Sequence, residues 1–104
     1  MIEDPVKPVI TSGVLKVSAK SNPNSVAGAL AAVLRDRPSA ELQAVGAGAI
    51  NQAVKAVAIA RSYLAGVTEL VCVPSFIDVQ IEGNDRTGIS LLIERRTEGP
   101  SSAS

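Results

Sequence analysis

Two short segments carry the residues whose types and spacing could hold an anion. They are Lys20, Ser21, Asn22 and Asn24 in the first, and Gly46, Ala47, Gly48, Asn51 and Lys55 in the second. Each segment follows a short apolar stretch and precedes a run rich in alanine and valine, which is typical of a strand, a turn and a helix. The first turn of a helix has backbone N–H groups without partners, and these groups together with a lysine attract phosphate. We therefore expect a phosphate-holding surface where the two turns meet.

Apolar periodicity predicts the elements that must position these turns. Residues 15–20 alternate apolar side chains with serine and lysine, which predicts a strand with one buried face. Asn22 followed by Pro23 predicts the N-cap and first position of a helix that ends before Pro38. A second helix is expected from the glycine-rich turn to about residue 64. Its predicted apolar stripe consists of Ile50, Ala53, Val54, Val57, Ala60 and Leu64.

Three further strands are expected from the same patterns. One covers residues 41–45, between the two helices, and a longer one covers 68–81 with an interruption at Pro74. The turn at 82–87 leads into the last strand. On the long strand one face is formed by Val71, Val73, Ile77, Val79 and Ile81, and on the last strand by Ile89, Leu91 and Ile93.

The order βαβαββ favours an α+β fold, in which a four-stranded mixed sheet carries two helices on one face. If the first two strands are parallel, both strand-to-helix turns lie at the same end of the sheet. We expect this single domain to occupy residues 14–96. The segments 1–13 and 97–104 have no sustained apolar period, and we expect both to be flexible.

The composition excludes several classes of chemistry. The 104 residues carry no net charge, no histidine and one cysteine, so histidine-based catalysis and an internal disulfide are absent. We expect Cys72, between two valines, to be a small buried apolar residue. The protein is therefore predicted to have no enzymatic activity, no metal and no cofactor. A cytoplasmic location is expected because no apolar run resembles a membrane span or a signal peptide, and association with the nucleoid is compatible with it.

The distribution of charge and the low aromatic content indicate how this chain could bind nucleic acid. Residues 14–61 contain six basic against two acidic side chains, whereas residues 62–96 contain three against five. Tyr63 and Phe76 are the two aromatic residues, too few for stacking on bases, so nucleic acid would be held through its phosphates. Ile59 and Tyr63 form an extra apolar edge on the second helix, and we expect this edge to contribute to a homodimer.

The run from Leu15 to Glu94 also resembles the stage V sporulation protein S family. The resemblance rests on Lys16-Val-Ser-Ala-Lys-Ser-Asn-Pro-Asn-Ser-Val-Ala-Gly-Ala-Leu30, on Gln43-Ala-Val-Gly-Ala-Gly-Ala-Ile-Asn-Gln-Ala-Val-Lys-Ala-Val-Ala-Ile-Ala-Arg61 and on Cys72-Val-Pro-Ser-Phe76. That family is similar in fold to the Alba chromatin proteins, small dimers that bind DNA and RNA. The resemblance thus implies an Alba-like fold and a role in spore development.

Residue by residue, the likeness to the Alba pattern is partial. Lys20 matches a lysine that Alba proteins carry just after the first strand. Alba proteins enter the second helix with Arg-Gly-Arg-Ala-Ile-Ser, where this chain has Val45-Gly-Ala-Gly-Ala-Ile-Asn51. Val45 and Ala47 therefore replace both arginines, which leaves backbone N–H groups as the main anion donors of that turn.

Two functions remain open at this point. The first is a small nucleic-acid-binding protein that contacts the phosphates of DNA or RNA weakly and without sequence preference, with a regulatory role in sporulation or development. The second is an adaptor in developmental regulation that binds another protein and makes no direct contact with nucleic acid. The basic first half of the chain favours the former, and the loss of the two arginines favours the latter.

Overall fold

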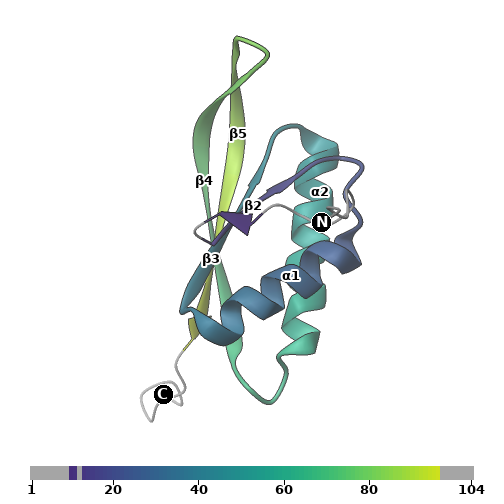
Figure 1. Ribbon diagram of the computed structural model, residues 1–104, viewed down its shortest axis with the longest axis vertical. Coiled ribbons are helices and arrows are strands. Elements are labelled where there is room, and N and C mark those ends of the chain that lie inside the picture. The colour runs from purple at the N-terminus through teal and green to yellow at the C-terminus, as the bar shows by residue number, and fades with distance from the viewer. Residues whose placement is uncertain (1–9, 12, 97–104) are drawn as a thin grey trace, which may run out of the picture.

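The computed structural model describes residues 10–11 and 13–96, so the flexibility expected for 1–9, 12 and 97–104 concerns residues outside this part. The helices are α1 (Pro23–Asp36) and α2 (Ala47–Tyr63), and both lie on one side of a mixed sheet (Figure 1). The strands are β1 (Ile10–Thr11), β2 (Val14–Val17), β3 (Ser39–Ala44), β4 (Glu69–Ile81) and β5 (Asn84–Arg96). The predicted α+β fold is confirmed, and β1 adds a two-residue strand beside β2.

The strand order β1-β2-β3-β5-β4 explains why the two turns share one end. β2 and β3 are parallel, with Val17 opposite Ala44, and a helix follows each of them. β5 pairs antiparallel with β3 and with β4. Because parallel strands end at the same edge of a sheet, the β2–α1 and β3–α2 turns lie at that edge. The pairing of β3 with β5 stops at Ala44 and Ile89, so the rest of the β4–β5 hairpin extends beyond the sheet (Figure 1).

The predicted start of α1 is confirmed in detail. Asn22 has an extended backbone, and its Oδ1 accepts hydrogen bonds from the N–H groups of Asn24 at 2.8 Å and Ser25 at 3.3 Å. Pro23 occupies the first turn, where its missing N–H costs nothing. At the other end, the N–H of Arg37 donates to the carbonyl of Val33. The helix is thus fixed by residues at both termini.

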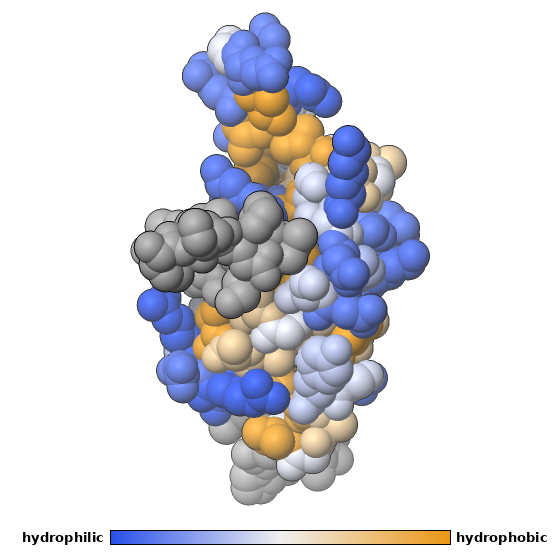
Figure 2. Space-filling model, turned by 45° about the vertical axis from the view of Figure 1, so that its right-hand side comes forward, coloured by the Kyte–Doolittle hydropathy of each residue, from blue (hydrophilic) through white to orange (hydrophobic). Residues whose placement is uncertain are grey.

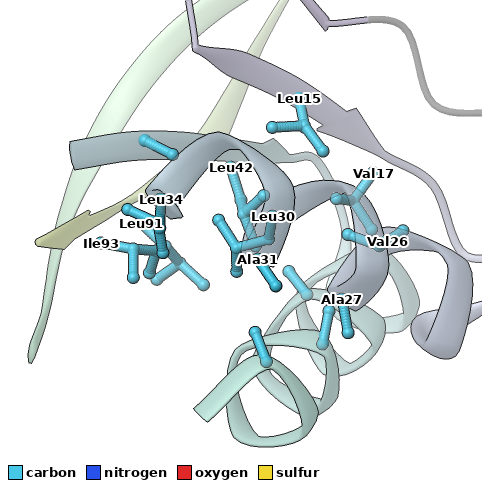
Figure 3. Close-up of a cluster of buried hydrophobic side chains, with 14 of the residues drawn as sticks. Leu15, Val17, Val26, Ala27, Leu30, Ala31, Leu34, Leu42, Leu91 and Ile93 are labelled. Atoms are coloured by element: carbon cyan, nitrogen blue, oxygen red, sulfur yellow. The ribbon is translucent and has the colours of Figure 1, made fainter. Parts of the chain in front are cut away.

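Aliphatic side chains of the sheet and α1 form the core, and α2 contributes small residues to it (Figure 3). Leu15, Leu42 and Ile93 meet the helices from the sheet. The buried residues of α2 are Ala49, Ala53, Ala56 and Ala60. The predicted stripe was wrong at Val54, which is 52% exposed, because the close contact with α1 selects alanines on a neighbouring line of the helix.

β4 differs from its sequence prediction in two ways. The strand continues through Pro74 without interruption, since β4 is an edge strand, where a proline can be accommodated. Its pairing partners Leu91 and Ile93 face the helices, so the odd-numbered residues of β4 point to the uncovered side of the sheet. The predicted apolar face of the strand therefore exists but no helix covers it, and Val73 is half exposed.

Candidate functional site

The structure brings the two β→α turns into direct contact. A Cβ atom placed on Gly48 would lie only 2.9 Å from the Cβ of Ala19, so the turns touch where Gly48 has no side chain. A few residues into α2, the Nε2 of Gln52 donates a 2.9 Å hydrogen bond to the carbonyl of Ser21. Gly48 and Gln52 therefore hold the first turn against the start of α2. The two turns that carry the predicted candidates therefore lie side by side.

Hydrogen bonds within the first turn determine which groups remain for a ligand. The N–H of Ser18 donates to the Oγ of Ser21, and the N–H of Lys20 donates to the Oγ of Ser18. Asn22 Oδ1 is already engaged as the helix cap of Asn24 and Ser25. Ser21 and Asn22 consequently shape the turn. The side chain of Lys20 is exposed and remains the charged group that this turn can offer.

The start of α2 is open, in contrast to that of α1. Gly46 is the N-cap with a φ of 93°, a conformation that favours glycine, and it provides no side-chain cap. The N–H of Ile50 donates to the carbonyl of Gly46, which is the first bond of the helix. Among the described residues, none accepts a hydrogen bond from the N–H groups of Ala47, Gly48 or Ala49. The sequence predicted two helix N-termini for an anion, and the structure leaves one of them free.

Polar side chains on the exposed face of α2 extend this surface. Asn51 and Lys55 are both exposed and lie one turn apart, as predicted. Lys55 is eight residues beyond Ala47, so its Cα lies about 12 Å along the helix from the open N-terminus. Neither Lys20 nor Lys55 forms an ion pair within residues 13–96. Asn24 is exposed on the first turn of α1, with its N–H used by the Asn22 cap.

The hairpin places acidic residues at the same end of the molecule. Asp78, Glu82 and Asp85 lie in its distal half, and the Nε2 of Gln80 donates to Asp85 at 3.0 Å. This half of the hairpin extends past the end of β3, on the side where the β3–α2 turn begins (Figure 1). The carboxylates lower the attraction of this end for a polyanion. The presence of Val45 and Ala47 in place of the two arginines of the Alba pattern lowers it as well.

The predicted apolar edge of α2 is divided in the structure. Ile59 is partly buried against the core, whereas Tyr63 is 48% exposed. A larger exposed apolar surface lies on the hairpin, and Figure 2 shows it below a hydrophilic tip. Phe76 is 80% exposed there, although its pairing partner Ile89 packs on the core. The sequence signal that could have identified this surface is Phe76, an apolar residue on the face of β4 opposite to Val73 and Ile77.

Cys72 is exposed, so the prediction of a buried residue was wrong. Its side chain lies on the helix-facing side of β4, but the helices cover only the start of this edge strand, where Leu70 is buried and Glu69 binds Arg61. Neighbouring atoms still remove part of the water around the sulfur, and this desolvation raises the pKa of the Cys72 thiol. A raised pKa lowers the thiolate fraction near neutral pH, which argues against a nucleophilic role.

The exposure of Cys72 has a direct test. We expect a maleimide to modify this thiol in the folded protein without unfolding, more slowly than in urea at neutral pH, because the raised pKa leaves less thiolate. Cys72→Ala is expected to change the free energy of unfolding by less than about 0.5 kcal/mol. Mass spectrometry of timed samples gives the rates. Protection until the chain unfolds would mean that the sulfur is buried after all.

Two structural findings concern other kinds of site. No group of three or more cysteine, aspartate or glutamate residues within the described ranges lies close enough to hold a metal ion. None of the helices described here is long and apolar enough to cross a membrane.

Comparison with protein families gives a match: the family model described as Stage V sporulation protein S matches residues 13–96. The matched range includes both turns, both helices and the hairpin.

Proposed function

The chain belongs to the stage V sporulation protein S family, which implies a role connected with sporulation, and within that role we propose that it binds nucleic acid. The ligand is DNA or RNA, held weakly through its phosphates and without sequence preference. The protein acts by binding and not by catalysis, as a regulator in the cytoplasm or at the nucleoid. The residues assigned to this site, either by contact or by shaping its turns, are Lys20, Ser21, Asn22, Asn24, Gly46, Ala47, Gly48, Asn51 and Lys55.

One observation carries this proposal. The open N-terminus of α2 lies in contact with the turn that presents Lys20, because Gly48 allows the approach of Ala19. Free N–H groups at a helix start favour an anion, and an adjacent lysine adds a full positive charge. The N–H groups of Ala47 and Gly48 would bind phosphate oxygens directly, while Ser21 and Asn22 keep the turn in shape. The glycines leave the backbone accessible.

The same geometry supports weak, sequence-independent binding. Phosphate contacts position a nucleic acid but carry no sequence information. Lys20 and Lys55 are the cations near the open helix start, and each phosphate contact contributes about eightfold in affinity at 0.1 M salt, since the salt slope per contact is roughly 0.9. Two such contacts give about sixtyfold. The acidic half of the hairpin acts against them.

A binding titration tests the proposal. Fluorescence anisotropy is measured with labelled duplex DNA and labelled single-stranded RNA, each in two unrelated sequences of equal length. The expected result is binding at low salt, with equal affinity for both sequences of a kind, because phosphates do not differ between them. Absence of binding to all four probes at about 0.05 M salt would overturn the proposal.

We propose in addition that the protein is a homodimer. The exposed side chains of Val73, Phe76 and Leu92 support this proposal. Val73 lies directly opposite Leu92 on the uncovered side of the sheet, and Phe76 lies on the other face of the hairpin. Val73 and Leu92 are thus a pair of neighbouring exposed apolar side chains, and such neighbouring apolar side chains are typical of interaction sites. Of the residues expected from the sequence, Tyr63 is available for the interface, and Ile59 contributes only its exposed part.

The dimer has a simple test. Light scattering at roughly tens of micromolar protein is expected to give twice the chain mass, since a specific interface of about 1,000 Å² or more is stable in this range. Phe76→Ser is expected to shift the mass toward the monomer without loss of folding, because Phe76 makes little contact within one chain. A monomeric parent protein would contradict the proposal.

The alternative function is an adaptor that binds another protein. The observation that favours it is the hairpin, which combines exposed Phe76 with carboxylates at Asp78, Glu82 and Asp85. Such a surface suits a partner with apolar and basic side chains. If neither DNA nor RNA binds in the titration above, this adaptor function becomes the stronger candidate.

A further inference from the structure

Arginines gather at the end of the molecule opposite the two β→α turns. This end is where α1 finishes at Asp36, α2 finishes at Tyr63 and β5 finishes at Arg96 (Figure 1). Three elements bring cations there, and the chain order alone does not show the grouping. The cluster, called the arginine end below, consists of Arg35, Arg37, Arg61, Arg95 and Arg96.

Hydrogen bonds fix the last strand against the end of α1. The Nη1 of Arg95 donates to the carbonyl of Leu34 at 3.1 Å, and the N–H of Arg95 donates to the carbonyl of Pro38 at 2.9 Å. Arg95 therefore binds the carbonyls on either side of residues 35–37, the segment that contains Arg35 and Arg37. The side chains of Arg35 and Arg37 are exposed, and both residues are next in sequence to a residue that Arg95 contacts.

The charges at this end do not cancel. The five arginines face three acids, which are Asp36, Glu69 and Glu94, and the net charge is +2. Arg61 donates two hydrogen bonds to Glu69, at 3.2 and 2.9 Å, and these bonds hold the pKa of Glu69 below its ordinary value. Glu69 is therefore already engaged. Toward the opposite end, Lys20 and Arg86, together with Lys55 halfway along α2, are set against Asp78, Glu82 and Asp85, and the balance is zero.

Stability of the fold explains part of the cluster only. Helix C-termini favour cations, which accounts for Arg35 in the last turn of α1, and Arg95 binds a terminal carbonyl of that helix. Arg61 is explained by Glu69. Arg37 has no carboxylate partner within the described residues. A guanidinium that is exposed and unpaired can bind a phosphate with two parallel hydrogen bonds.

We infer that the arginine end is a second surface that contacts the phosphates of nucleic acid. This inference rests on the proposed function, since the ligand is of the same class. α2 runs from one surface to the other, and its 17 residues span about 25 Å. The two surfaces lie at opposite ends of that helix, so one chain contacts two separate stretches of phosphate backbone.

The test uses the full chain with Arg35→Gln and Arg37→Gln combined. Both positions are exposed, and Arg95 is left intact because it binds the end of α1. The expected result is a salt slope lowered by about 1.8 for duplex DNA and an affinity about sixtyfold lower at 0.1 M salt. The matched control combines Lys16→Gln and Arg86→Gln, which removes the same charge from exposed positions of β2 and the hairpin. We expect the factor by which the control weakens binding to be less than a third of the factor measured for the arginine variant.

The outcomes separate this inference from the proposed function. If the arginine variant equals the control while a Lys20 and Lys55 variant weakens binding, the arginine end is not a contact and the proposed function stands. If the arginine variant alone weakens binding, the inference stands and the site at the turns is wrong. If the double variant unfolds in circular dichroism, Arg37→Gln alone decides, with an expected loss of about eightfold and a contradiction if its affinity is unchanged.

Discussion

Replacement of Gly88 by alanine is expected to lower the free energy of unfolding by about 2–3 kcal/mol. Gly88 is buried in β5, one residue before the pairing of β5 with β3 begins. A Cβ atom at this position would lie 2.8 Å from the carbonyl oxygen of Ala44 and 2.9 Å from Cγ2 of Val45. Because one of these atoms belongs to the backbone, the strand itself has to move. The substitution therefore strains the junction between the hairpin and the β3–α2 turn.

Urea unfolding of the variant and the parent measures this effect, with Gly28→Ala as the matched control. Gly28 lies in the middle of α1, and nothing within 4 Å would meet a Cβ there. The control is expected to raise stability by about 0.5–1 kcal/mol, since alanine favours the helix. If Gly88→Ala changed stability by less than the control does, the close approach of β5 to Ala44 would be incorrect.

Combined replacement of Lys20 and Lys55 by alanine is expected to weaken nucleic-acid binding about sixtyfold at 0.1 M salt. The two side chains are the cations nearest the open start of α2, and neither takes part in an ion pair within the described part of the chain. Their loss should affect all sequences alike and lower the salt slope by about 1.8 for duplex DNA. Lys20→Ala is expected to contribute more than Lys55→Ala, because Lys55 lies farther along the helix.

The control for this pair is again the removal of Lys16 and Arg86, here by alanine. Both variants lose two positive charges, so the difference between them reports position and not net charge. Anisotropy titrations at three salt concentrations give the affinities and the slopes. Equal losses in the two variants would show that binding follows the general field of the protein and not the paired turns.

Much of the fold could be predicted from the sequence because local signals were strong. Asn22 and Pro23 have the residue types of an N-cap and a first helical position, and the structure uses them in these roles. The parallel arrangement of β2 and β3 followed from two consecutive strand–helix units. That rule also predicted that the two turns meet, although it could not show that Ala19 and Gly48 are the point of contact.

Other features could not be predicted, because periodicity tells which residues share a face but not what covers it. The alternation in β4 was identified, yet the helices leave Cys72 and Val73 exposed. Val54 was predicted to be buried because valine is more hydrophobic than alanine. The packing of α2 on α1 depends instead on small side chains, and the buried residues of α2 are alanines. The grouping of Arg35 with Arg95 depends on a contact between residues far apart in the chain, for which the sequence gives no local signal.

The salt dependence of binding by the unmodified protein tests the central claim most directly. Affinity for duplex DNA is measured between about 0.05 and 0.2 M salt, and the logarithm of the association constant is plotted against the logarithm of the salt concentration. The expected slope is about −1.8 if Lys20 and Lys55 alone contact phosphates, and about −3.6 if Arg35 and Arg37 also do so. Binding that does not change with salt, or no binding at the lowest concentration, would contradict the assignment of this protein as a phosphate-contacting nucleic-acid binder.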